Sequence, residues 1–254
     1  MSISRIQEIA EDFTTIDLTE MDKVQLMSRV DTKFTFSQKK LIEILPNLQK
    51  DYRVLSVDGI LLSEYESLYY DDAQLTSYVD HHRKRLSRFK VRYRKYINSN
   101  IAFLEVKHKK NGRTNKKRIP VDDIPLELSE EHEKFVKKTG VKGGKLQPCL
   151  WNSFKRITLV SKAMNERLTF DIDLTFKWDG KEQKEENIII AELKQGKAMR
   201  NSPFYQLMKN HQIRPLRVSK YCIGIIMMYG KKKVKYNRFK KKLLKLNKIN
   251  KHAA

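Results

Sequence analysis

The stretch RFKVRYR, residues 88–94, decides the fold expected for this chain of 254 residues. Its apolar residues Phe89, Val91 and Tyr93 alternate with a lysine or an arginine at every other position. Alternation with a period of two is typical of a β-strand, because successive side chains point to opposite faces of a sheet. The stretch is therefore predicted to be a strand with one apolar face and one strongly basic face.

Three more segments repeat this alternation, at residues 101–107, 167–175 and 188–194. Each of the three carries a carboxylate on the same face as a lysine or an arginine. One such strand is ordinarily half-buried, with its charged side in water. Four of them also fit a closed barrel with a charged interior, which would be costly unless a ligand of opposite charge occupies it. The alternation does not distinguish these two arrangements.

Shorter elements complete the expected order. Strands are expected at residues 32–36, 53–57, 65–70 and 221–229. A helix is expected to open at residues 18–21, with Val24, Leu26 and Met27 as its apolar positions. Further helices are expected from Ser37 and at residues 72–85, 130–138 (capped by Ser129) and 203–210. No internal repeat and no Gly/Ser/Pro-rich linker divides the chain. One domain is therefore expected over residues 1–230, followed by a basic tail over residues 231–254.

The formal net charge is +23, which predicts a polyanionic partner such as nucleic acid, an anionic membrane or polyphosphate. The two cysteines, Cys149 and Cys222, are too few and too far apart for a disulfide framework or a cysteine-rich zinc site. No apolar run approaches the roughly 20 residues that span a bilayer, and the first residues do not have the pattern of a signal peptide. We therefore expect a soluble protein of a reducing compartment.

An ordered set of charged residues runs through these elements. It consists of Arg29-x-x-x-Lys33-Phe34, Lys90-x-Arg92-x-Arg94, Glu105-x-Lys107, Lys116-x-Arg118, Arg156, Arg167-Leu-Thr-Phe-Asp171, Glu192-x-Lys194 and Arg217-x-x-Lys220-Tyr221. In order and spacing this set resembles the VTC domain, the polyphosphate polymerase domain of the vacuolar transporter chaperone complex. That domain belongs to the triphosphate tunnel metalloenzymes, the CYTH-like superfamily. The resemblance covers nearly the whole chain, from about Arg29 to Gly230.

The resemblance implies an α+β fold, in which an antiparallel eight-stranded β-barrel forms a tunnel with a charged interior and helices pack outside. It also implies roles for individual residues. They are Arg92, Arg94, Lys107 and Arg167 as catalytic residues, Lys33, Lys90, Lys116 (or Lys117), Arg118, Arg156, Lys194, Arg217 and Lys220 as phosphate-binding residues, and Glu192, Asp171 and Glu105 as ligands of Mn2+ or Mg2+. Arg217 stands where the family pattern has a lysine, and its spacing from Lys220 requires a turn or a bulge between them.

The residues alone leave blander roles open for the carboxylates. Glu192 and Lys194 also fit a cross-strand surface pair. Asp171 and Asp173 also fit solvent-facing strand positions, and Glu105 also fits a role in orienting Lys107. The tail after residue 230 carries no carboxylate. It fits a solvated, partly helical segment, a guide for a polyphosphate product or an anchor on an anionic membrane surface.

The function that the resemblance implies is transfer of the terminal phosphoryl group of ATP to a growing polyphosphate chain. Alternatives are a triphosphatase or polyphosphatase of the same fold, a nucleic-acid or other polyanion-binding module without turnover, and a polyphosphate sensor. Tunnel triphosphatases open with Glu-x-Glu-x-Lys, whereas Arg29 and Asp31 precede Lys33 here, which favours the polymerase. Carboxylates among the arginines would repel a nucleic-acid backbone, so no specific nucleic acid is expected. The expected partners are ATP, inorganic polyphosphate and a separately encoded membrane protein, and the expected location is the cytoplasm, with association at the inner face of the membrane.

Overall fold

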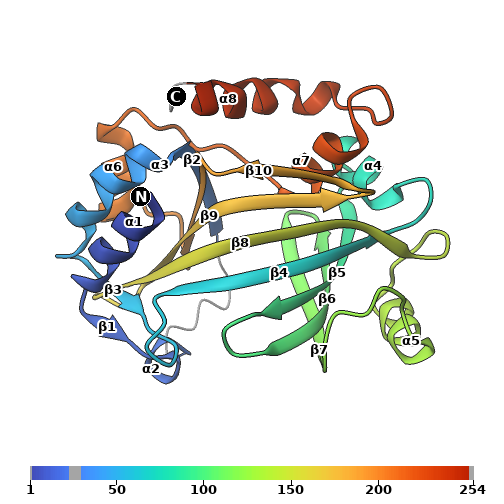
Figure 1. Ribbon diagram of the computed structural model, residues 1–254, viewed down its shortest axis with the longest axis horizontal. Helices are drawn as coiled ribbons and strands as arrows, with labels where there is room; N and C mark the ends of the chain where they lie inside the picture. The colour runs from blue at the N-terminus through green and yellow to red at the C-terminus, as the bar shows by residue number, and fades with distance from the viewer. Residues whose placement is uncertain (1, 23–29, 252–254) are drawn as a thin grey trace.

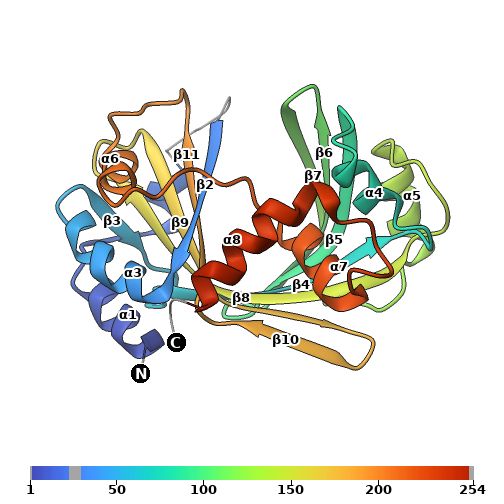
Figure 2. The same cartoon turned by 90° about the horizontal axis from the view of Figure 1, so that it is seen from above.

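The computed structural model describes residues 2–22 and 30–251, with one sheet of eleven strands at its centre. Eight of these strands form one continuous antiparallel path, in the order β2-β11-β9-β8-β4-β5-β6-β7. Their bounds along this path are Val30–Ser37, Ile188–Gln195, Glu166–Trp178, Gln147–Ser161, Leu62–Asp71, Ser87–Tyr96, Ile101–Lys110 and Arg113–Val121. The path curls into a half-barrel, as Figure 2 shows from above, and within the described residues its end strands β2 and β7 are not paired with each other. The expected α+β fold, an antiparallel eight-stranded barrel with helices packed outside, is confirmed in the form of a curled half-barrel sheet with helices around it.

Three short strands extend this sheet. Strand β3 (Tyr52–Leu55) pairs with β8, and β1 (Thr15–Ile16) pairs with β3 in parallel. Strand β10 (Lys181–Glu185) forms a hairpin with β9. Helix α2 (Leu18–Asp22) follows β1, and the predicted apolar positions Val24, Leu26 and Met27, like Arg29, lie outside the described residues.

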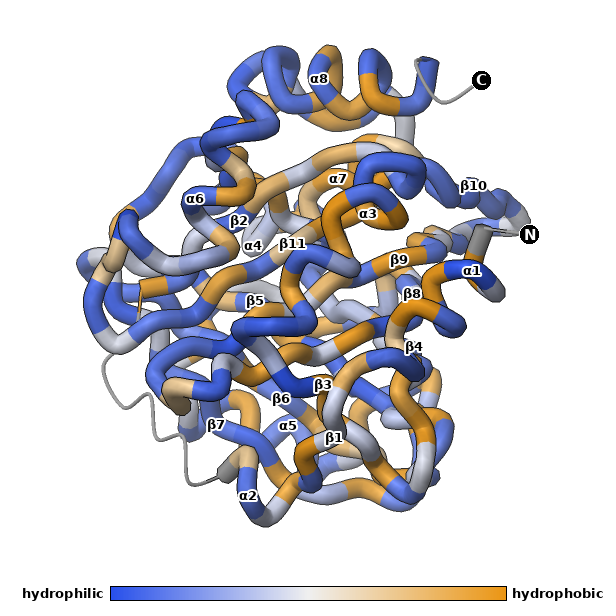
Figure 3. The backbone as a smooth tube through the Cα atoms, turned by 90° about the vertical axis from the view of Figure 1, so that its left-hand side faces the viewer, coloured by the Kyte–Doolittle hydropathy of each residue, from blue (hydrophilic) through white to orange (hydrophobic). Residues whose placement is uncertain are grey.

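Helices cover the outer side of the half-barrel (Figure 1). Helices α1 (Ser2–Glu11), α3 (Gln38–Ile44) and α6 (Pro203–Asn210), with the 3-10 turn Leu45–Leu48, bury the outward apolar residues of β2, β11 and β9 in one core. Helix α5 (Glu130–Lys138) packs on the outward residues of β5 and β6 in a second core. This outward packing leaves the charged residues of the same strands on the inner side, as alternation requires. Figure 3 shows the resulting mixture of hydrophobic and hydrophilic positions along the strands.

The prediction of a strand at residues 221–229 is wrong, because this segment is helix α7 (Lys220–Tyr229). Nearly all its residues are buried, so the helix has no polar face and its sequence shows no helical period. The helix lies on the inner side of the sheet and packs against Leu150 of β8 and Phe176 of β9. A Cβ atom at Gly224 would lie 2.6 Å from both of these side chains, so only glycine allows this close approach.

The basic tail forms helix α8 (Lys240–Lys251), preceded by a 3-10 turn at Asn237–Phe239. Its residues Leu243 and Leu246 are buried in the same core as α7. Near its end Asn250 Nδ2 donates a hydrogen bond to Glu185 Oε2 at 2.5 Å, and before its start Tyr78 Oη donates to the Lys235 carbonyl at 2.7 Å. The segment therefore packs against the domain over its described length. Among the described residues, no helix is both long and apolar enough to cross a membrane.

Most other sequence predictions of elements are confirmed, but four strands (β1, β7, β8 and β10) and helix α1 were missed. The helices at 130–138 and 203–210 have the expected bounds, and Ser129 Oγ accepts a hydrogen bond from the His132 amide at 3.2 Å. The helix predicted at 72–85 is shorter, because α4 (Thr76–His82) begins only after Leu75, which has a left-handed backbone with φ of 54°. Strands β7 and β8 were not predicted, although the ordered residues included Lys116 and Arg156 on them.

Candidate active site

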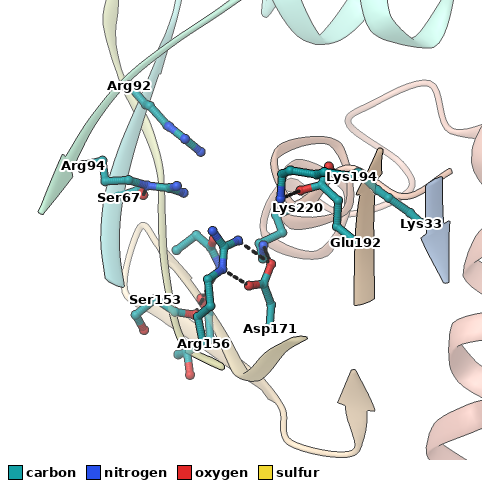
Figure 4. Close-up of polar contacts among 12 residues, drawn as sticks. Lys33, Ser67, Arg92, Arg94, Ser153, Arg156, Asp171, Glu192, Lys194 and Lys220 are labelled. Carbon is teal, nitrogen blue, oxygen red and sulfur yellow. Dashed lines mark hydrogen bonds and ion pairs between the residues drawn. The ribbon is translucent and has the colours of Figure 1, made fainter. Parts of the chain in front are cut away.

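Charged side chains from both halves of the curled sheet face its inner side. Figure 4 shows Arg92 and Arg94 of β5 projecting toward Lys194 of β11 on the opposite wall and toward Lys220 of α7. Cross-strand register places three carboxylates directly opposite three cations: Glu105 faces Arg92, Asp171 faces Arg156, and Glu192 faces Lys33. Each carboxylate also contacts a second cation, so the inner face is built from three similar clusters.

The first cluster surrounds Glu105 of β6, whose side chain is 1% exposed. Arg92 donates to Glu105 Oε2 from Nε at 2.9 Å and from Nη2 at 2.6 Å, and Lys116 Nζ donates to Oε1 at 3.2 Å. Burial by itself would raise the pKa of Glu105, but the charges of Arg92, Arg94 and neighbouring lysines hold it well below its usual range. Glu105 is therefore ionised and fixes the orientation of Arg92.

The second cluster surrounds Asp171 of β9, where the arginine binds both carboxylate oxygens. Arg156 Nε donates to Oδ1 at 2.5 Å and Nη2 donates to Oδ2 at 3.0 Å, while Lys220 also pairs with Oδ2 (Figure 4). Burial acts to raise the pKa of Asp171, but Arg156 and Lys220 hold it far below its usual range. Because Lys220 is the first residue of α7, this cluster joins helix α7 to the sheet.

The third cluster surrounds Glu192 of β11. Lys33 of β2 pairs with Oε1, and Lys194 Nζ lies 3.0 Å from Oε2. The Glu192 side chain is 16% exposed, compared with 1% for Glu105 and 3% for Asp171. Of these three carboxylates, Glu192 is the one that a ligand or an ion on the inner side can reach most easily.

The buried Arg94 and the half-buried Lys107 on this face have no carboxylate partner among the described residues. Arg94 is 6% exposed, and its Nε donates only to Ser67 Oγ at 3.1 Å, while its guanidinium lies 5.4 Å from the ring centroids of Tyr65 and Phe154. Burial and the nearby Arg92 lower the pKa of Arg94 to about 10. Lys107 forms no hydrogen bond or ion pair within the described chain, and the charge of Arg92 together with burial lowers its pKa well below the usual value. The inner face is thus short of negative charge.

A comparison with protein families agrees with this arrangement. The VTC domain family model matches residues 28–229, which is most of the chain. The chain belongs to the VTC domain family. It is therefore a tunnel-fold protein that handles phosphates or nucleotides. It is an enzyme of the tunnel family, and membership of this family suggests dependence on a divalent metal.

Solved structures similar to this VTC domain include two putative adenylate cyclases. The one from Bacillus halodurans is 12% identical, with 76% of this chain and 94% of that chain covered and a TM-score of 0.49. The one from Vibrio parahaemolyticus is 12% identical, with coverages of 78% and 99% and a TM-score of 0.45. A conserved hypothetical protein from Pyrococcus furiosus is 14% identical, with coverages of 77% and 99% and a TM-score of 0.41. No curated protein matches the sequence.

Three arginines that were expected in the site of this VTC domain lie outside the three carboxylate clusters. Arg167 Nη2 donates to the Met21 carbonyl of α2 at 3.2 Å. Arg118 is exposed and stacks over the Phe103 ring at 4.3 Å from its centroid. Arg217 is exposed in the segment before α7, so the turn required between it and Lys220 is the start of a helix. Their assigned roles stay predictions.

The sequence predictions assigned no site residue to the inner face of β4. Tyr69 Oη accepts a hydrogen bond from Arg92 Nη1 at 3.0 Å, and its ring lies 5.1 Å from that of Tyr221. Burial acts to raise the pKa of Tyr69, but Arg92, Arg94, Lys90 and Lys220 together lower it. The signal was present, because Tyr65, Ser67 and Tyr69 alternate within the segment predicted as a strand.

The carboxylates constrain how a metal can bind. Among the described residues no group of three histidine, cysteine or acidic side chains is arranged to hold a metal ion. A protein-only cage therefore does not fit. Mg2+ and similar ions are commonly held by one or two carboxylates together with substrate phosphates. Glu192, the most exposed of the three, fits that role, whereas Asp171 and Glu105 are tightly bound by arginines.

Proposed function

We propose that this VTC domain is an ATP-dependent polyphosphate polymerase. The observation that carries the proposal is the excess of cations on the inner face, above all the buried Arg94 and the half-buried Lys107, beside three carboxylates that already contact two cations each. Buried cations without partners are costly, so a site of this kind favours a ligand with many negative charges. A phosphate chain supplies such charges at regular intervals along an extended molecule.

The proposed reaction needs positioning and charge neutralisation more than covalent chemistry. A terminal oxygen of the polyphosphate chain attacks the γ-phosphorus of ATP, the bond to the β,γ-bridging oxygen breaks, and ADP leaves. Arg92, held by Glu105, and Arg94 offer guanidinium groups that match phosphate oxygens, while Lys107 and Lys220 add point charges. When bound, Mn2+ or Mg2+ at Glu192 would neutralise charge on the transferred group.

The proposal is tested by incubating the purified protein with ATP and Mn2+ and separating the products on a gel, with ADP and free phosphate measured in parallel. We expect phosphate chains and one ADP for each phosphate incorporated. Release of free phosphate without chains would assign hydrolysis to the site, and the absence of any nucleotide turnover would assign binding alone. Arg113→Ala, an exposed change on β7, serves as a control that keeps full synthesis.

We also expect phosphate-chain binding to weaken as the pH rises. Burial, despite the opposing charge of Asp171, lowers the pKa of Lys220 to about 8, so Lys220 loses its proton near pH 8 in the free protein. The charge of Arg92 together with burial also lowers the pKa of Lys107 well below its usual value, so Lys107 loses its proton at a lower pH than an ordinary lysine. A bound polyanion favours their charged forms and raises both pKa values. Binding of tripolyphosphate should therefore take up protons at pH 8, which calorimetry in buffers of different ionisation enthalpy measures. Proton uptake should shrink in Lys107→Met, and net proton release by the wild type would contradict this account.

The remaining expectations rest on the family assignment and stay predictions. They are the substrates ATP and inorganic polyphosphate, a cytoplasmic location near the inner face of a membrane, a separately encoded membrane-protein partner, and the division into a tunnel domain (1–230) and a basic tail (231–254).

A further inference from the structure

Cations face one another in rows across β5, β6 and β7 at one end of the inner face. Along these rows the register aligns Arg92 with Glu105 and Arg118, then Lys90 with Lys107 and Lys116, then Arg88 with Lys109. Only the first row contains a carboxylate. Like charges directly opposite each other on neighbouring strands are destabilising, so the second and third rows reduce stability in the free protein. Such an arrangement is expected where a polyanion neutralises the rows.

The third row lies outside every role assigned so far. Arg88 Nη1 donates to the Arg85 carbonyl at 2.6 Å, and within the described chain its buried Nε has no hydrogen-bond partner. Lys109 is half-buried and forms no hydrogen bond or ion pair with a described residue. Burial and the charges of Arg88 and Arg217 lower the pKa of Lys109, and only Asp31 opposes them appreciably.

Helix α8 continues this positive field. Lys242, in its first turn, is half-buried with Nζ 5.3 Å from the Phe239 ring centroid. Burial lowers the pKa of Lys242, and the charges of Lys84 and Arg217 lower it further. The charge of Arg217 contributes to the lowered pKa of both Lys242 and Lys109. Figure 2 shows α8 crossing between the two halves of the sheet beside α7, with which its residues Leu243 and Leu246 share a core.

We propose that Arg88, Lys109 and Lys242 form a second subsite for polyphosphate, an exit track that binds the part of a long chain extending beyond the inner face. This inference rests on the proposed function and specifies its substrate as a polymer longer than the inner face itself holds. A nucleotide or tripolyphosphate bound among Arg92, Arg94 and Lys107 would not need these three cations. A long chain would neutralise them as well, so its affinity should exceed that of the short ligand and depend more strongly on salt.

The test compares Arg88→Gln/Lys109→Gln/Lys242→Gln with wild type and with Lys134→Gln/Lys137→Gln/Lys138→Gln, which removes the same charge from exposed positions of α5. Affinities for tripolyphosphate and for a long polyphosphate are measured by calorimetry at several salt concentrations. We expect the first variant to bind the long chain about tenfold more weakly, with a slope of log K against log salt reduced by about 2, and to bind tripolyphosphate within about twofold of wild type. The α5 variant should match wild type for both ligands.

Three results would overturn the exit track: unchanged long-chain affinity in the first variant, an equal loss in the α5 variant, or an equal loss for tripolyphosphate. The first would show that the three cations do not bind the chain, the second that only net charge matters, and the third that they belong to the inner site. Failure of wild type to bind either ligand would overturn the proposed function itself. These outcomes separate the two proposals.

Discussion

Replacing Arg94 with alanine is expected to lower kcat/KM for polyphosphate synthesis by about 10³-fold or more, because an arginine that neutralises a transferring phosphoryl group contributes on that scale. Arg94 donates to Ser67 Oγ and has no carboxylate partner among the described residues, so its guanidinium is available to phosphate. Arg94→Lys keeps the charge but loses the planar fork, and we expect a smaller loss of activity.

The same substitution should leave the protein folded, which separates a role in the site from a role in stability. Removing a buried charge without an ionic partner relieves a desolvation cost, while the contacts of its side chain with Tyr65 and Phe154 are lost. We expect these effects to offset each other, with the free energy of unfolding within about 1 kcal/mol of wild type. Denaturant unfolding measures this quantity. Loss of activity together with a large loss of stability would show that Arg94 acts mainly in folding.

Asp171→Asn is expected to have the largest effect on stability in the absence of a ligand. Asp171 is 2% exposed and contacts both Arg156 and Lys220, so the neutral side chain would leave two largely buried cations, with side chains 16% and 13% exposed, without their shared anion. Removal of one member of a buried ionic cluster commonly costs about 3–5 kcal/mol. We expect a loss of about 3 kcal/mol in the free energy of unfolding, measured by denaturant titration at pH 7.

A bound anion should repair part of this defect. Tripolyphosphate is expected to raise the unfolding midpoint of Asp171→Asn by more than it raises that of wild type, because it supplies charge where the carboxylate was lost. Glu182→Gln is the matched control, since Glu182 pairs with Lys177 on the exposed hairpin and should give no measurable change. Equal stabilisation of Asp171→Asn and wild type by tripolyphosphate would mean that the anion does not bind near Arg156 and Lys220.

The sequence was sufficient to predict those strands that have one apolar face and one charged face. Alternation predicted β5, β6, β9 and β11 because each has an apolar outer face under helices and a charged inner face. It failed for α7, which is buried on almost every side and therefore has no polar positions to reveal a helical period. Length did not help, since an apolar segment of this size fits either a strand or a buried helix.

The site was predictable as a set of residues but not as an arrangement. Spacing identifies Glu105, Asp171 and Glu192, but the contact of Glu192 with Lys33 depends on the pairing of β11 with β2, and the contact of Asp171 with Lys220 depends on where α7 packs. Both contacts join segments that are distant in sequence. Register is a property of the folded sheet. For the same reason the sequence does not show that Arg94 and Lys107 are left without carboxylate partners among the described residues, the feature on which the functional proposal depends.

A crystal structure of the protein with tripolyphosphate tests the central claim most directly, since it locates the ligand without relying on turnover. We predict phosphate oxygens within hydrogen-bonding distance of Arg92, Arg94 and Lys107 on the inner side of the sheet, with Glu105 still holding Arg92. The account would be contradicted if tripolyphosphate bound only on an outer surface, such as the exposed lysines of α8, and the inner cations kept their present contacts.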